Sequence, residues 1–90
     1  MCRSIRPLFN YEPPSSDAEI RAAARQYVRK VSGFTEPSAA NQAAFDQAVG
    51  EVAETTARLL GSLTTKAPPR DRAAEARRAR VRAALRFPSR

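Results

Sequence analysis

The segment after Pro68-Pro69 constrains the fold most, because it is rich in arginine and poor in large apolar residues. Asp71 is the expected cap of a helical run to about Arg86, and the alanine content of this run favours a helix. Val81 and Leu85, followed by Phe87, are its large apolar residues, so arginines surround all but a narrow seam of the helix. We therefore predict a third, C-terminal helix that contributes little to a hydrophobic core.

The positive charge of the chain is concentrated in the same segment. The net charge is +7. Residues 1–65 contain seven basic and seven acidic side chains, whereas residues 66–90 contain nine basic and two acidic ones. A basic helix binds nucleic-acid phosphates through counterion release, without reading the base sequence. The candidate nucleic-acid-binding residues are Arg72, Arg77, Arg78, Arg80, Arg82 and Arg86.

A structural role or a protein partner would also account for these arginines. They could pair with carboxylates of the preceding helix, such as Asp46, Glu51 and Glu54, and form a solvated structural element. They could also contact an acidic protein partner. A GC-rich genome would explain the preference for Arg over Lys, but not the placement of the charge. A membrane-surface helix is disfavoured, because it needs a wide apolar face opposite the basic one.

Two earlier segments show helical periodicity. The run Ser16-Asp17-Ala18-Glu19 matches a capping box, and Gly33 is the expected C′ residue of the helix that it begins. Its predicted buried face contains Ile20, Ala24, Tyr27, Val28 and Val31.

The second helix is predicted from about Ser38 to Thr64, with Ser38 or Asn41 as its cap. Its large residues recur at heptad spacing, and Leu60 widens the seam. The seam residues are Phe45, Val49, Val52, Thr56, Leu59 and Leu63. The loop between the two helices is short, which favours an antiparallel helical hairpin.

The overall prediction is an all-α fold with an extended N-terminal arm. Prolines 7, 13 and 14 disfavour helix in the first fifteen residues, and we expect this arm to pack across the hairpin. The arm and hairpin occupy residues 1–67 and the basic helical tail occupies residues 68–90, within one domain overall. Ninety residues form a marginally stable monomer, so a partner chain could complete the core.

Few residues in this sequence could act in catalysis or bind a metal or cofactor. The chain has no histidine, and its three glycines form no phosphate loop. Its carboxylates are not spaced as a metal site, so we expect no cofactor, no metal and no enzymatic activity. Cys2 is the exception: with Met1 removed, its own amino group could act as a base, as an enzyme or redox protein would require.

The sequence also bears on location. No stretch approaches the roughly 20 apolar residues of a membrane span, and the first ten residues lack the apolar run of a secretory signal. A single cysteine excludes an internal disulfide framework. We expect a protein of a bacterial or other reducing cytoplasm, with no membrane partner.

Three stretches resemble one known family. They are MCRSIRPLFNYEPP at the start, DAEIRAAARQYVRKVSGFTEPS over the first helix and the loop after it, and LLGSLTTKAPPRDR from the end of the second helix into the tail. Together they are similar to the domain-of-unknown-function family 2277, a set of short, mostly bacterial proteins. The resemblance implies a complete, stand-alone protein, and it assigns no activity and no site residue.

The function predicted from the sequence is therefore binding rather than catalysis. The leading hypothesis is a small basic protein that binds RNA, or the ribosome, through the arginine-rich third helix. The alternative is a protein-interaction module, which could self-associate as a homodimer through the heptad seam of the second helix.

Overall fold

The structure is a computed structural model, and it describes residues 5–86. Helices dominate it, as predicted, and two very short strands add a parallel pair that the sequence pattern does not predict. In chain order the elements are β1 (Tyr11–Glu12), α1 (Asp17–Ser32), the 3₁₀ turn η1 (Ala39–Asn41), α2 (Gln42–Ser62), β2 (Arg70–Asp71) and α3 (Arg72–Arg86).

Helix α1 has the two ends that its sequence predicts. The Ser16 hydroxyl accepts a hydrogen bond from the Glu19 amide at 3.2 Å, and the Glu19 carboxylate accepts one from the Ser16 amide at 2.9 Å. This is a complete capping box. Gly33 ends the helix at φ 81°, a left-handed conformation that favours glycine, and its amide donates to the Arg29 carbonyl.

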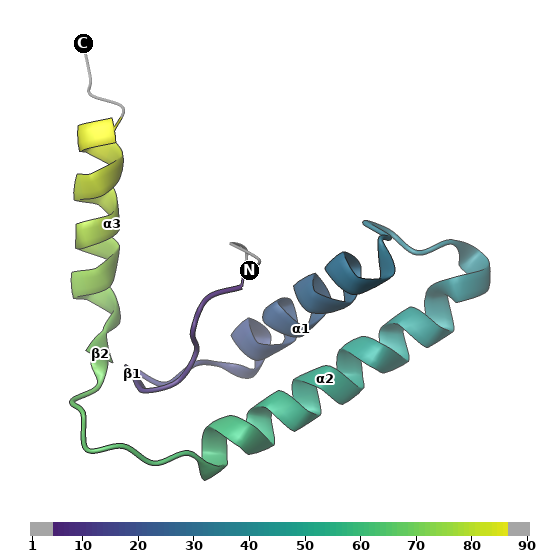
Figure 1. The fold of residues 1–90 in the computed structure, drawn as a ribbon, viewed down its shortest axis with the longest axis horizontal. Coiled ribbons are helices and arrows are strands. Elements are labelled where there is room, and N and C mark those ends of the chain that lie inside the picture. Colours follow the sequence, from purple (N-terminus) through teal and green to yellow (C-terminus); the bar gives the residue numbers. More distant parts are fainter. Residues whose placement is uncertain (1–4, 87–90) are drawn as a thin grey trace.

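Helices α1 and α2 lie side by side and run in opposite directions (Figure 1). Their contact buries Ala24 and Val28 from α1 against Phe45 and Val49 from α2. Ile20, one turn before Ala24, is the fifth buried core residue. The guanidinium carbon of Arg25 lies 5.3 Å from the centre of the Phe45 ring. The five core residues cover a short stripe of each helix, which makes this a small core.

The buried face of α1 is narrower than the sequence predicts. Ile20, Ala24 and Val28 follow one another at a spacing of four and are buried, whereas Tyr27 is 49% exposed and Val31 68% exposed. Helix α2 covers one stripe of side chains along α1, and the side chains next to this stripe face solvent. The prediction that Tyr27 and Val31 lie on the buried face is therefore wrong.

Helix α2 begins later than predicted and buries only the first part of its seam. Its first regular residue is Gln42, because the 3₁₀ turn η1 precedes it. Ser38 lies just before this turn and Asn41 is its last residue, and neither caps the backbone with its side chain. Leu59 and Leu63 are 55% and 43% exposed. The reason is geometric, since the C-terminal turns of α2 extend past the start of α1 (Figure 1).

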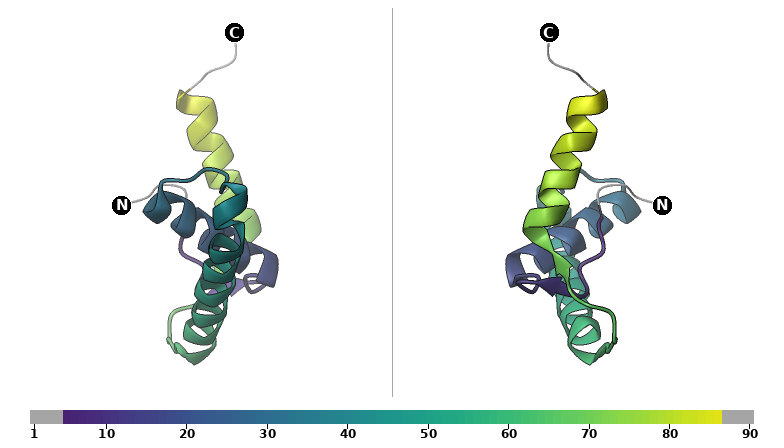
Figure 2. Two further views of the ribbon diagram at one scale, coloured as in Figure 1. Left: turned by 90° about the vertical axis from the view of Figure 1, so that its right-hand side faces the viewer. Right: turned by 90° about the vertical axis from the view of Figure 1, so that its left-hand side faces the viewer.

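Helix α3 points away from the α1–α2 pair (Figures 1 and 2). None of its residues is buried within the part of the chain that the structure describes, which agrees with a helix of few large apolar residues. The radius of gyration is 16.3 Å. A compact domain of this length would have about 12 Å, so the projecting helix makes the molecule elongated.

The N-terminal arm holds the start of α3. Strand β1 pairs in parallel with β2, with Tyr11 opposite Arg70 and Glu12 opposite Asp71. The Arg70 amide donates to the Asn10 carbonyl at 2.7 Å. Asp71 also caps α3, as predicted, by accepting hydrogen bonds from the amides of residues 73 and 74. The arm thus contacts the tail rather than lying across the helical pair.

Candidate functional site

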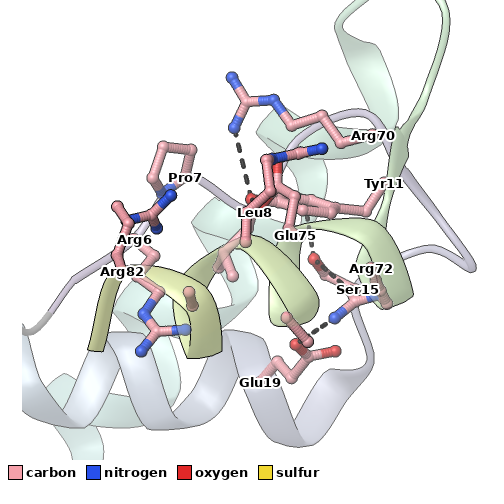
Figure 3. Close-up of a pocket in the computed structure, with 13 residues that line it drawn as sticks. Arg6, Pro7, Leu8, Tyr11, Ser15, Glu19, Arg70, Arg72, Glu75 and Arg82 are labelled. Carbon is pink, nitrogen blue, oxygen red and sulfur yellow. Dashed lines mark hydrogen bonds and ion pairs between the residues drawn. The ribbon is translucent and has the colours of Figure 1, made fainter. Parts of the chain in front are cut away.

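A pocket of about 600 Å³ lies where the arm, the first turn of α1, β2 and α3 meet (Figure 3). This volume lies within the range of small-molecule sites. Charged side chains dominate its lining. Five are arginines and two are glutamates, namely Arg6, Arg70, Arg72, Arg78, Arg82, Glu19 and Glu75. The excess of arginine makes the pocket electropositive.

Arg72 connects the segments that line this pocket, because it contacts both the arm and α1 from α3. Its Nε donates to the Pro13 carbonyl at 2.7 Å, and its two terminal nitrogens donate to Glu19 at 2.8 Å and to the Ser15 hydroxyl at 3.2 Å. Its guanidinium carbon lies 5.0 Å from the centre of the Tyr11 ring. The planar fork of arginine suits such a set of contacts, in which one side chain joins three segments.

Glu19 has two roles at this junction. It completes the capping box of α1 and accepts the ion pair from Arg72. The Ser16 backbone amide, followed by the Arg72 guanidinium, holds the pKa of Glu19 below its usual value, because both stabilise the charged carboxylate. Near neutral pH the carboxylate is therefore ionised and engaged with Arg72.

Tyr11 lies between the second glutamate and β2. Its hydroxyl donates to Glu75 Oε2 at 3.2 Å and accepts from Arg70 at 3.4 Å. The Tyr11 hydroxyl raises the pKa of Arg70 further above its usual range, so Arg70 stays positively charged. The other oxygen of Glu75 lies 3.9 Å from Arg78, a loose contact between partly exposed groups.

The predicted binding residues do not form one uniform set. Arg72 anchors α3, and Arg78 lies beside Glu75 in the pocket. The remaining four are exposed and form no ion pair with a carboxylate in residues 5–86. They are Arg77, Arg80, Arg82 and Arg86.

The alternative that these arginines pair with the carboxylates of α2 is wrong within the described residues. Asp46 accepts from Gln42, Glu51 from Gln47, and Glu54 pairs with Arg58 at 2.7 Å. All three carboxylates thus take partners from their own helix, at a spacing of four residues. The physical reason is that α3 points away from α2 (Figure 1).

Sequence reasoning missed the side chains that the arm and α1 bring to the pocket. The sequence pattern predicts no binding role for Arg6, Tyr11 or Glu19, although it predicts Glu19 as part of a capping box. One weak signal of contacts at the start of α3 is present in the sequence, because Asp71 and Glu75 are the two acidic residues of an otherwise basic segment. Asp71 caps the helix and Glu75 contacts the arm.

Two residues singled out in the sequence, Cys2 and Phe87, lie outside the described residues. Within residues 5–86, no group of three or more acidic, cysteine or histidine side chains is arranged to hold a metal ion. None of the described helices is long and apolar enough to cross a membrane.

The fold and pocket define a small, mainly helical protein in which polar contacts join the arm to a projecting basic helix. The chain belongs to DUF2277, a family of uncharacterized conserved proteins, whose model matches residues 1–78. The match ends inside α3, so it includes the first turns of that helix but not Arg80, Arg82 or Arg86. No curated protein and no solved structure gave a significant match.

Replacing Arg72 with Gln should release α3 from the arm, because Gln cannot keep the contacts to Pro13, Ser15 and Glu19 together. Hydrogen exchange at the Arg70 amide, which is bonded to the Asn10 carbonyl, should accelerate roughly tenfold, as expected for the loss of a charged hydrogen bond. Exchange within α1 and α2 should stay slow.

The matched control for this variant is Arg77→Gln, which removes the same charge from the same helix without touching these contacts. Equal acceleration in both variants would show that net charge, not the Arg72 contacts, holds the arm.

Acidification should weaken the same attachment. A carboxylate with a lowered pKa stabilises the folded state at pH values above its unfolded pKa, and this stabilisation is lost as the pH falls through the folded pKa. Exchange at the Arg70 amide, corrected for intrinsic rates, should therefore rise below about pH 4. Glu19→Gln, which cannot titrate, should show a smaller pH dependence there; an unchanged dependence would assign the effect to another carboxylate.

Proposed function

We propose that this protein is a non-enzymatic RNA-binding protein, and that α3 is its binding element. The α1–α2 hairpin and the arm serve as the scaffold that presents α3. Single-stranded RNA, as found in loops of ribosomal RNA, is the partner that this arrangement suits best, because arginine contacts both phosphates and unstacked bases.

The observation that carries the proposal is the exposure of the α3 arginines. Arg77, Arg80 and Arg86 face solvent and pair with no carboxylate of residues 5–86. No described residue of α3 is buried, so folding alone does not explain this helix. Exposed guanidinium groups on a projecting helix can approach a phosphate backbone without first breaking internal ion pairs.

The proposal is tested by binding a fluorescently labelled single-stranded RNA with a 5′-hydroxyl end, at 50 to 300 mM salt. Affinity should fall steeply with salt. In the triple variant Arg77→Gln, Arg80→Gln and Arg86→Gln, the slope of log affinity against log salt should shrink by about 2, since each phosphate contact to a single strand contributes about 0.7.

A second triple variant controls for total charge. Arg21→Gln, Lys30→Gln and Arg58→Gln removes three exposed charges from α1 and α2. It should lower affinity much less than the α3 variant. Equal losses, or no binding of the wild-type protein at 50 mM salt, would overturn the proposal.

A second candidate function is self-association, and the exposed apolar residues of the α1–α2 pair favour it. Leu59 and Leu63 continue the heptad seam of α2 beyond the small core, and both are exposed. Exposed residues of this kind on a small protein are typical of an interaction surface. A second copy could bury them against its own α2.

Sedimentation at micromolar concentrations tests this candidate. The wild-type protein should sediment as a dimer, and Leu59→Glu with Leu63→Glu should convert it to a monomer, because two buried carboxylates would oppose the contact. Leu85→Glu on α3, which alters a still more exposed leucine outside the seam, should leave the dimer intact. A wild-type monomer would rule the candidate out.

A further inference from the structure

The positive charge of the pocket is only partly neutralised. Glu19 forms an ion pair with Arg72 at 2.8 Å. Glu75 accepts a hydrogen bond from the Tyr11 hydroxyl and forms a loose ion pair with Arg78. These two carboxylates therefore offset two of the five arginines that line the pocket. The other three, Arg6, Arg70 and Arg82, form no ion pair with a carboxylate in the described part of the chain.

Two of these arginines come from different segments and lie at the same end of the pocket. Arg6 belongs to the arm and Arg82 to the second half of α3, and both line the pocket, on the same side of the view in Figure 3. Arg70 belongs to β2 and donates a hydrogen bond to the Tyr11 hydroxyl. Arginines that line one pocket repel one another, and an anion bound in the pocket would reduce this repulsion.

The chemistry of the pocket favours a phosphate group over a single carboxylate. A phosphate monoester carries about two negative charges near neutral pH and three acceptor oxygens. Two guanidinium forks can each engage a pair of such oxygens. Pro7, Leu8, Ala76 and Ala79 form an apolar part of the lining, which gives room for the organic part of the ligand.

We propose that this pocket binds an organic phosphate monoester, with the phosphate held between Arg6 and Arg82. The ligand is a free nucleotide or the 5′-phosphorylated end of a strand, since both carry the same group. This site is separate from the three exposed arginines that carry the RNA-binding proposal, because Arg77, Arg80 and Arg86 do not line the pocket.

Calorimetric titration with adenosine 5′-monophosphate tests the site, with adenosine as the ligand that lacks the phosphate. The monophosphate should bind saturably and adenosine should not. Arg6→Gln and Arg82→Gln should each weaken binding about tenfold, as expected for the loss of one charge-assisted contact. Arg21→Gln, which removes the same charge from an exposed position of α1 outside the pocket, should leave the affinity unchanged.

Arg6→Gln also separates a site from a general effect on folding, because Arg6 is exposed and lies outside the Arg72 contacts. No saturable binding of the monophosphate, or equal weakening in all three variants, would overturn the proposal. Equal binding of adenosine would also overturn it.

A second pair of ligands identifies the source of the phosphate. A short oligonucleotide with a 5′-phosphate is compared with the same strand ending in a 5′-hydroxyl, using Arg6→Gln in both titrations. If Arg6→Gln weakens binding of the phosphorylated strand as well as of the monophosphate, the pocket takes strand ends. If it weakens binding of the monophosphate alone, the pocket takes free nucleotides. Failure of the salt-dependent RNA binding proposed above leaves the titration with adenosine 5′-monophosphate unaffected, so the two proposals fail separately.

Discussion

The position of α3 depends on one side chain, Arg72. A helix is usually positioned by its buried apolar face, but no described residue of α3 is buried. Its orientation relies instead on polar contacts at its first turn, where Arg72 joins Pro13, Ser15 and Glu19 and lies over the ring of Tyr11. Directional hydrogen bonds can fix an angle that nonspecific apolar contact would leave open. The short parallel pairing of β1 with β2 reinforces the same junction.

This kind of attachment has a consequence for motion. Partly exposed ion pairs contribute little to stability, since water and salt compete with them. The side chains of Arg72 and Glu19 are 30% and 41% exposed. The junction should therefore open at a lower free energy than the α1–α2 contact, where the buried apolar residues lie. Because the same contacts form the walls of the pocket, a ligand that bridges the arm and α3 would stabilise the junction by mass action.

The features that could be predicted from the sequence are those that depend on residues close together in the chain. The Ser16–Glu19 capping box, the left-handed Gly33 and the Asp71 cap each need only a few neighbouring residues, and all three are present. The pairing of Tyr11 with Arg70 joins residues far apart in sequence, and two-residue strands leave no periodic pattern. The burial of Val28 but not Tyr27 depends on where the second helix lies, which helical periodicity alone does not determine.

The same limit applies to the candidate site. The concentration of arginine marks α3 as a whole, yet the structure gives its arginines different surroundings. Arg72 is an anchor, Arg82 lines the pocket, and Arg80 projects into solvent. Their surroundings differ because of the arm. It approaches α3 through the β1–β2 pairing and adds a second set of side chains to one face of the helix. The charge of a segment thus indicates the class of ligand, whereas the contacts made by distant residues determine which of its charges remain available to bind one.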